Sequence, residues 1–342
     1  MLARWLQRQW FQRRLTPALS FLLPLLLPLH LLFVFLSAQA RRRARPQRLP
    51  VPVVVVGNLT VGGAGKTPLT LWLARSLAAR GWRPGIVSRG YGREGEGVRA
   101  VRADSLAAEV GDEPLLLARR SGLPVFVGRD RVAAAHALLA AHPATDLILC
   151  DDGLQHTRLA RDVELAVFDG RGAGNGWRLP LGPLREPVRR LLTVDVVIGN
   201  FSAGAGDDLP GVTLPPGKPL FPMRLRPGRF ERLDRPGQVA DAEYFRGRRL
   251  HALAGIGDPP RFFATLAALG LEATPHPFPD HHAYQAADLA FAADDILLMT
   301  EKDAVKCSAL VPGEAWFLPV EAELPPALIE LVEEKLRGRQ AA

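Results

Sequence analysis

The sequence predicts an α/β protein whose core is a mostly parallel sheet of the P-loop NTPase type, with helices on both faces. Three observations predict it. Short apolar runs alternate with helical patterns between residues 49 and 200. The first of these runs is followed by a glycine-rich segment that ends in Lys66 and Thr67. Ahead of the core, residues 15–40 contain no Asp, Glu, Lys or Arg, which predicts an N-terminal membrane helix.

The elements of the core follow in order along the chain. Strands are predicted at residues 53–56, 86–87, 124–127, 147–150 and 163–168, and helices at residues 67–80, 105–120 and 131–141. Strands that alternate with helices in this way lie parallel, and ligands bind at their carboxyl ends. A second αβ pattern follows, with strands at 250–254 and 296–299 and helices at 260–269 and after residue 300.

The chain therefore divides into four predicted segments. Residues 1–48 are a basic and apolar membrane anchor, 49–220 the P-loop core, and 250–342 a smaller C-terminal αβ domain. Residues 221–249 are an inter-domain linker, which overlaps a stretch at 202–240 that is rich in Gly, Pro and charge.

The apolar run of residues 15–40 is long enough to cross the ~30 Å hydrocarbon core of a bilayer as a helix. Pro17, Pro24 and Pro28 interrupt it, so a bent hairpin inside one leaflet is the alternative. The arginines that follow favour a cytoplasmic location for the rest of the chain, and hence the inner membrane. A cleaved signal peptide is the competing interpretation, because residues 38–40 read Ala-Gln-Ala.

Charge and cysteine content exclude other classes of protein. The chain carries a net charge of +8, but residues 1–48 hold nine arginines and no acidic residue, so residues 49–342 sum to 8 − 9 = −1. The basic character belongs to the membrane segment and predicts no nucleic-acid partner. Two cysteines, Cys150 and Cys307, provide no disulfide framework and fit a reducing compartment.

The glycine-rich segment at residues 57–67 predicts a nucleotide site. It reads Gly-Asn-Leu-Thr-Val-Gly-Gly-Ala-Gly-Lys-Thr, and glycines let main-chain amides approach phosphate oxygens closely. We expect Lys66 to reach the β- and γ-phosphates of ATP and the Thr67 hydroxyl to bind Mg²⁺. Thr60 stands where the strict pattern has glycine, and a turn without a ligand is the alternative. The predicted cofactor-binding residues are Gly62, Gly63, Ala64, Gly65, Lys66 and Thr67.

Carboxylates and histidines provide the other candidates. Asp151 and Asp152 follow an apolar strand and are predicted metal ligands, without a choice between them. Asp112 lies at the start of a predicted helix. It is the N-cap of that helix, the base for an acceptor hydroxyl, or both. His281 and His282 are a structural pair, or one of them orients a distant carboxylate.

Two further loops carry arginines, the natural partners of phosphate and carboxylate, with surface salt bridges as the alternative. They provide the candidate substrate-binding residues Arg89, Tyr91, Arg185 and Glu186. Thr300-Glu301-Lys302-Asp303 lacks the spacer of a guanine-specificity motif, so GTP is not expected.

In this order the motifs resemble the tetraacyldisaccharide 4′-kinase family, the membrane-bound lipid A kinases of Gram-negative bacteria. The resemblance covers nearly the whole chain and rests on residues 57–68, 88–93, 111–114, 151–156, 179–186, 255–259, 280–281 and 300–303. Thr60 is similar to what the family itself carries, whereas Leu181 is a minor departure.

The resemblance implies transfer of the γ-phosphate of ATP to the 4′-hydroxyl of a tetraacylated glucosamine disaccharide 1-phosphate, which gives lipid IV-A. It implies that Lys66 and Thr67 hold phosphates and Mg²⁺, that Asp151 or Asp152 completes the metal site, and that Arg185 and Glu186 lie at the active site. Asp112 is the implied catalytic base, and His281 its partner from the second domain. No obligate protein partner is implied.

Two other classes remain open. One is a membrane-associated ATPase of the partitioning or targeting type with a Gly-Gly-x-Gly-Lys-Thr loop, although Val61 stands where those proteins carry a signature lysine. The other is an NTPase whose membrane segment docks on a transport channel.

Overall fold

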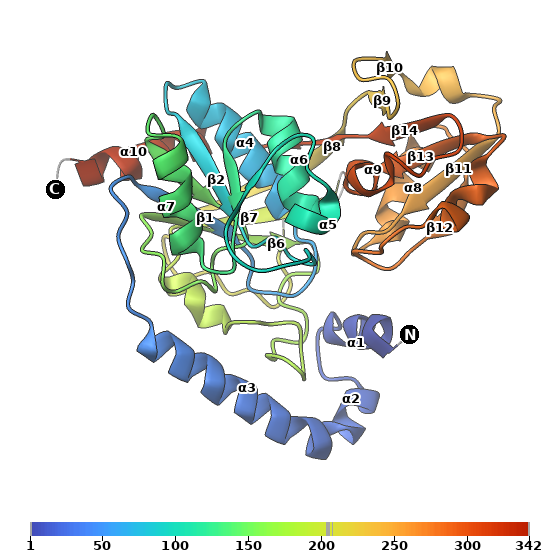
Figure 1. Cartoon of the computed structure of the whole chain (residues 1–342). Helices are drawn as coiled ribbons and strands as arrows, with labels where there is room; N and C mark the ends of the chain where they lie inside the picture. Colours follow the sequence, from blue (N-terminus) through green and yellow to red (C-terminus); the bar gives the residue numbers. More distant parts are fainter. Residues whose placement is uncertain (1, 203–205, 207, 341–342) are drawn as a thin grey trace.

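The computed structural model describes residues 2–202, 206 and 208–340. It contains two α/β units and an N-terminal helical arm that runs along the larger unit (Figure 1). The predicted fold class is confirmed. Residues 1 and 341–342, which end two of the predicted segments, lie outside the described residues.

The larger unit is built on a nine-stranded sheet with the order β15-β8-β7-β6-β1-β5-β2-β4-β3. Its central strands are parallel, as predicted, and only β3 and β15 pair antiparallel to their neighbours at the two edges. The strands are β1 (Val53–Gly57), β2 (Pro84–Ser88), β3 (Arg99–Val101), β4 (Val125–Val127), β5 (Leu147–Cys150), β6 (Val163–Asp169), β7 (Val196–Phe201), β8 (Leu220–Pro227) and β15 (Val320–Glu323).

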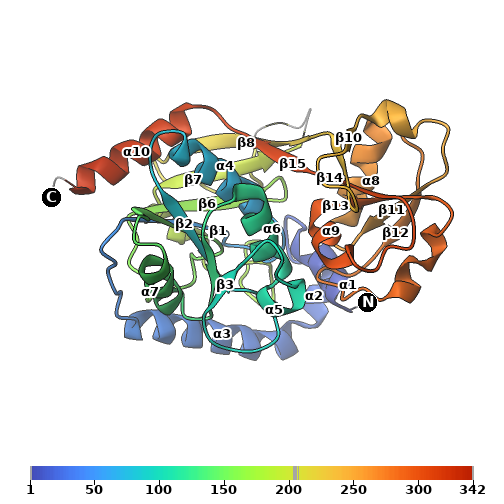
Figure 2. The ribbon, with the colours of Figure 1, turned by 45° about the horizontal axis from the view of Figure 1, so that its top comes forward.

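Both faces of this sheet are covered, which explains why its strands are apolar without alternation. Val54 and Val56 of β1 pack in one core with helices α4 (Lys66–Ala78), α6 (Asp112–Ser121) and α10 (Ala327–Gln340). Val53 and Val55 pack in the opposite core with α7 (Arg131–Ala141). Figure 2 shows α4 and α6 on one side of the sheet and α7 on the other.

The smaller unit has a six-stranded sheet with the order β10-β9-β14-β13-β11-β12. Two separate cores on its faces contain residues of helix α8 and of helix α9. Its elements are β9 (Phe230–Arg232), β10 (Val239–Ala240), η2 (Ala242–Phe245), β11 (Leu250–Ala254), α8 (Pro259–Ala268), β12 (Thr274–Pro277), η3 (Ala286–Ala292), β13 (Ile296–Thr300), α9 (Glu301–Cys307) and β14 (Ala315–Leu318).

The boundaries between the units differ from the predicted ones. Residues 221–249 are not a linker, because they contain most of β8, which extends the large sheet, and β9 and β10 of the small sheet. The chain crosses between the units a second time from β14 to β15. At the crossing the two segments touch, with Gly228 N donating to Pro319 O at 2.9 Å.

The predicted C-terminal domain of residues 250–342 is therefore too long. Strand β15 pairs antiparallel with β8, and α10 buries Leu328, Ile329, Val332 and Leu336 in a core of the large unit. A local hydrophobic pattern predicts that a segment is half-buried, but it does not predict which sheet the segment packs on. The pattern therefore could not predict that residues 320–340 rejoin the large unit.

The predicted helix at residues 105–120 is also interrupted. Gly111, with φ of +92°, separates α5 (Ala107–Val110) from α6. A Cβ there would lie 3.1 Å from Tyr91 O, so the glycine permits a close approach of the 88–93 loop. The break makes Asp112 the first residue of α6.

The N-terminal arm consists of α1 (Leu2–Trp10), α2 (Pro17–Phe21) and α3 (Leu23–Arg43). Pro17 is the first residue of α2, while Pro28 is accommodated inside α3. Helix α3 is long and apolar enough to cross a membrane, and only 6% of its apolar window is buried.

Candidate active site

The glycine-rich loop connects the carboxyl end of β1 to the first turn of α4. Gly62 and Gly65 adopt φ of +99° and +96°, values that other residues rarely adopt. A Cβ on Gly65 would come within 2.6 Å of Asn200 Nδ2, whereas one on Gly63 would meet nothing within 4 Å. Asn200 therefore packs closely against the loop at Gly65, whereas the space beside the Gly63 Cα is open. Such a shape suits a phosphate bound by main-chain amides at a helix N-terminus.

Lys66 begins α4 and lies among polar groups of the loop. Its Nζ is 3.4 Å from Asn58 Oδ1 and 3.6 Å from Asp152 Oδ1. Arg185 joins the same group, with Nη2 3.4 Å from Asp152 Oδ1 and a short contact to Asn58 Oδ1. Burial would raise the pKa of Asp152, but Lys66 and Arg185 outweigh it and lower that pKa to about 2.

Asp151 lies in a different environment from its neighbour. It is fully buried, and its Oδ1 accepts a hydrogen bond from Thr70 Oγ1 at 3.0 Å. Its Oδ2 is buried without a hydrogen-bond partner among the described residues. Burial, with the negative charges of Glu113 and Asp152, raises the pKa of Asp151 well above that of an ordinary aspartate.

These observations fit a bound nucleotide with a divalent cation. An unpartnered buried carboxylate oxygen is costly, and a cation would both satisfy and neutralise it. Asp151 has the unpartnered carboxylate oxygen, and Thr67 lies in the first turn of α4, so their role as Mg²⁺ ligands stays a prediction. Asp152 already has two cationic partners, Lys66 and Arg185, so Asp151 is the better candidate for a cation ligand.

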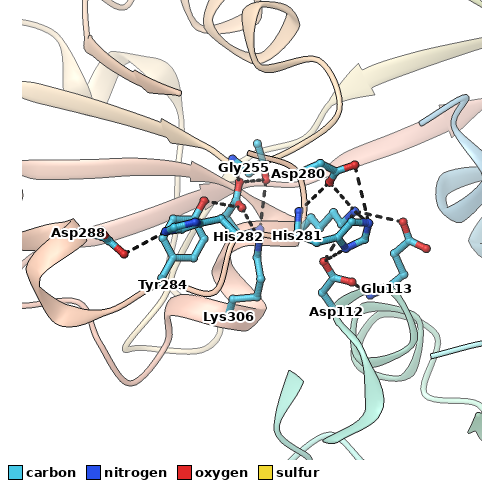
Figure 3. Close-up of polar contacts among 12 residues, drawn as sticks. Asp112, Glu113, Gly255, Asp280, His281, His282, Tyr284, Asp288 and Lys306 are labelled. Carbon is cyan, nitrogen blue, oxygen red and sulfur yellow. Dashed lines mark hydrogen bonds and ion pairs between the residues drawn. The ribbon is translucent and has the colours of Figure 1, made fainter. Parts of the chain in front are cut away.

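A second cluster forms where α6 meets the smaller unit (Figure 3). His281 Nδ1 lies 3.0 Å from Asp112 Oδ2, so two of the predicted catalytic residues, 169 positions apart in the chain, are in contact. His281 has φ of +59°, a left-handed conformation uncommon for histidine, and Asp280 Oδ1 accepts a hydrogen bond from its amide. Asp112 is only 6% exposed.

Lys302 is the residue of this cluster that sequence reasoning missed. Its Nζ is 3.2 Å from Glu113 Oε1, 3.1 Å from Asp280 Oδ1 and 3.7 Å from Asp112 Oδ2. It thereby joins the carboxylates of the two units. The feature of the sequence that could have indicated Lys302 is its position in Thr300-Glu301-Lys302-Asp303, directly after a strand of the second αβ pattern.

The charges in this cluster stabilise one another. Burial would raise the pKa of Asp112, but the hydrogen bond with His281 and the charge of Lys302 lower it to about 2. The same hydrogen bond raises the pKa of His281, against the effect of burial. Burial would lower the pKa of Lys302, but the carboxylates of Glu113, Asp112 and Asp280 raise it, so this ammonium stays charged.

Asp303, the last residue of the same motif, holds the backbone around the cluster. Fully buried, it accepts hydrogen bonds from Gly255 N at 2.9 Å and Tyr284 Oη at 2.9 Å. The hydrogen bond with Gly255 fixes the start of the loop after β11. A Cβ on Gly257 of that loop would lie 3.6 Å from Gly63 N, so the smaller unit reaches the phosphate loop. His282 contacts Asp288 instead of Asp112, at 3.0 Å.

The four candidate substrate residues fall in three places. Tyr91 is 59% exposed and packs on the His281 ring at 5.0 Å, and the Arg89 guanidinium lies 5.9 Å from the Tyr91 ring centre. Arg185 braces the phosphate loop, where its Nε donates to Thr60 O at 3.1 Å. Glu186 is 2% exposed and bound by Arg41, Gln155 and Arg190, so it is enclosed. Their roles in substrate binding stay predictions.

Comparisons with known proteins identify the family of this chain. The family model described as Tetraacyldisaccharide-1-P 4′-kinase matches residues 22–337. The chain belongs to this family. It is 66% identical to the tetraacyldisaccharide 4′-kinase of Dechloromonas aromatica strain RCB over the full length of both chains, and 54% identical to that of Azoarcus sp. strain BH72 over 93% of each.

Its structure is similar to a crystal structure of the family, LpxK from Aquifex aeolicus in complex with ATP. The TM-score is 0.77 at 27% identity, and the match covers 93% of this chain and 99% of that one. The family match and the structural match both extend over the two units of the chain.

The first prediction concerns Lys66. Because its ammonium lies at the start of α4 beside the open part of the phosphate loop, Lys66→Ala should lower turnover by at least ~10²-fold, as loss of one preorganised charge often does. Lys335→Ala, on α10, is the matched control and should keep its turnover. Near-normal turnover of Lys66→Ala in a steady-state assay would contradict the role.

The second prediction separates the two neighbouring histidines. His281→Ala should lower kcat by roughly 10²-fold with little change in ATP affinity, since a group that orients a base acts on the transition state. His282→Ala removes a ring of the same size that contacts Asp288 instead, and its kcat should change less than threefold. Equal losses of kcat in the two variants would contradict a catalytic role for the contact between His281 and Asp112.

The third prediction is a pH dependence of stability. Contact with Asp112 raises the pKa of His281 from 6.5, so its stabilisation is complete below about pH 6.5 and is lost as the pH rises through the raised value. The pKa of Asp112 is lowered from 3.8 to about 2, so its contribution is present above about pH 4 and is lost as the pH falls towards 2. The unfolding free energy lost in His281→Ala should therefore be largest between about pH 4 and 6.5. Denaturant titrations across that range measure it, and a pH-independent loss would refute the pairing.

Proposed function

We propose that this chain transfers the γ-phosphate of ATP to the 4′-hydroxyl of a tetraacylated glucosamine disaccharide 1-phosphate, a late step of lipid A biosynthesis. Membership of the 4′-kinase family supports the reaction and its substrates. The observation that carries the mechanism is the contact between Asp112 and His281, which come from different units, beside a loop shaped for phosphates.

In this proposal Asp112 accepts the proton of the acceptor hydroxyl. The new O–P bond forms at that oxygen while the bond between the γ-phosphorus and the bridging oxygen breaks and leaves ADP. Because its pKa is about 2, Asp112 is ionised at neutral pH and free to accept a proton. Such a carboxylate is a weak base, so its contribution is largely orientation of the nucleophile, which phosphoryl transfer through a loose transition state requires.

Lys66 and the main-chain amides of residues 62–67 would hold the phosphates. Mg²⁺, held by Thr67 and Asp151, would supply neutralisation of charge on the transferred phosphoryl group. Lys302 and His281 keep Asp112 ionised and in place. Since both belong to the smaller unit, a complete site depends on the two units being in contact.

The test is an assay with labelled ATP, Mg²⁺ and the disaccharide lipid acceptor. We expect the label in the extracted lipid. Label that appears only as free phosphate would favour a membrane-associated ATPase of the partitioning type and refute the proposed transfer.

We propose further that the N-terminal arm attaches the kinase to one leaflet of the inner membrane, with both units on the cytoplasmic side. Three points of the arm contact the large unit. Trp10 Nε1 donates to Pro180 O at 2.9 Å, His30 Nδ1 lies 3.0 Å from Arg178 O, and Arg41 pairs with Glu186 at 2.5 Å. A spanning helix would place its two ends on opposite sides of the bilayer, and one folded unit cannot contact both.

The exposed face of α3 supports this orientation. Leu25, Leu29, Leu32 and Leu36 are at least half exposed and lie on one face at helical spacing. His30 and Arg41, which contact the core, lie two and nine residues from Leu32, on the opposite face at 3.6 residues per turn. Helix α3 thus presents leucines outward and the core-binding side chains inward, as a helix lying in a membrane interface does.

The fourth prediction follows from this arrangement. Cysteines introduced singly by Gln12→Cys and Ala40→Cys flank the apolar segment, and both should react with a membrane-impermeant maleimide added from the cytoplasmic side. The native Cys150 and Cys307 are buried and provide the background. Labelling of one position from each side of the membrane would show that the segment spans.

A further inference from the structure

Arg261 of the smaller unit reaches the phosphate loop of the larger one. It lies in the first turn of α8, and its Nη2 is 3.4 Å from Asn200 Oδ1, near the carboxyl end of β7. The Nδ2 of the same amide donates to Ala64 O at 3.1 Å. One side chain, that of Asn200, therefore separates the Arg261 guanidinium from the main chain of the loop.

The position of Arg261 is fixed by the packing of α8. Phe262 and Leu266 of this helix are buried in a core of the smaller unit. Just before the helix, Gly257 comes so close to the phosphate loop that a Cβ on it would lie 3.6 Å from Gly63 N. The two units are therefore in contact at the start of α8, and the Arg261 side chain is partly buried there.

The guanidinium of Arg261 has no counter-ion. Among the described residues, no Asp or Glu forms an ion pair with it, and the side chain contacts the neutral amide oxygen of Asn200 instead. That contact, at 3.4 Å, is longer than the about 2.8 Å of a charge-assisted hydrogen bond. Helix α8 also has no acidic residue in its first turn, where the helix dipole disfavours a cation. A partly buried charge in this environment is stabilised when an anion joins it.

The nucleotide is the anion that the phosphate loop would bring to Arg261. The order of the large sheet places β7 on one side of β1 and β5 on the other. Lys66 contacts Asp152, which follows β5, whereas Arg261 contacts Asn200 of β7. The two cations thus approach the loop from opposite sides. Guanidinium groups match phosphate oxygens with paired N–H donors, and an arginine from outside the loop stabilises phosphates in other P-loop enzymes.

We propose that Arg261 binds the polyphosphate of ATP from the smaller unit, on the side of the phosphate loop opposite Lys66. ATP is the phosphoryl donor of the proposed function, on which this assignment rests. Because Arg261 and His281 belong to the same unit, docking of that unit brings a positive charge to the donor phosphates and a partner to Asp112 in one step.

The test compares full-length Arg261→Gln with Arg246→Gln, which removes the same charge from the smaller unit. The Arg246 side chain is 58% exposed and pairs with Glu243 of η2 at 2.5 Å. The first readout is the dissociation constant of ATP and of ADP in the presence of Mg²⁺, measured by titration calorimetry. The second is the Tm without nucleotide and the increase in Tm that saturating ATP with Mg²⁺ produces.

Arg261→Gln should weaken ATP binding about 10-fold relative to the control, or about 1.4 kcal/mol. Its Tm without nucleotide should match that of the control, whereas the increase in Tm with ATP should be smaller. A loss for ATP alone would place the guanidinium on the γ-phosphate, and an equal loss for ADP would place it on the α- or β-phosphate. An ATP affinity equal to that of the control would overturn the proposal, whatever the change in kcat.

The binding assay needs no lipid acceptor, which separates its outcome from that of the proposed function. If the wild-type chain binds ATP but transfers no phosphate to the acceptor, the proposed function fails, while the role of Arg261 is still tested. If Arg261→Gln does not fold, Arg261→Lys keeps the charge but loses the paired donors, so it should weaken ATP binding about threefold. Arg261→Lys with the ATP affinity of the wild-type chain would then overturn the proposal.

Discussion

The contact between the two units at Asp112 is the interaction on which the rest of the site depends. Asp112 is buried at the start of α6, and a buried carboxylate without partners would take up a proton. Among the described residues, its charged partners His281 and Lys302 both come from the smaller unit. A further ion pair, between Arg120 at the other end of α6 and Glu301 of α9, holds the same two helices together. Ionisation of Asp112 and docking of the two units therefore favour each other.

Asp151 and Asp152 are adjacent and chemically identical, but their surroundings shift their pKa values in opposite directions. Asp152 is neutralised by Lys66 and Arg185 and remains ionised, whereas Asp151 is buried near other carboxylates with one oxygen unpartnered. In the absence of a cation, Asp151 binds a proton more readily than Asp152 does.

The sequence predicted those parts of the site whose residues lie close together in the chain. The strand, glycine loop and Lys66 belong to one short segment, and the pairing of Asp112 with His281 came from family resemblance. Pattern alone could not place Lys302, because its four partners lie on α6 and on the 279–282 loop, far away in the chain. The wrong domain boundaries have the same cause. Apolar residues such as Leu328 and Val332 could pack on either sheet, and the tertiary structure places α10 on the large unit.

The N-terminal arm and the phosphate loop are connected through Glu186. This carboxylate is almost fully buried, yet it binds Arg41 of α3 on one side and, through Gln155, the carbonyl of Asn58 on the other. Removing Arg41 would leave Glu186 with Arg190 as its remaining cationic partner and loosen the group that supports the phosphate loop. The connection from α3 to the main chain of the phosphate loop therefore runs through the polar contacts of two side chains, Glu186 and Gln155.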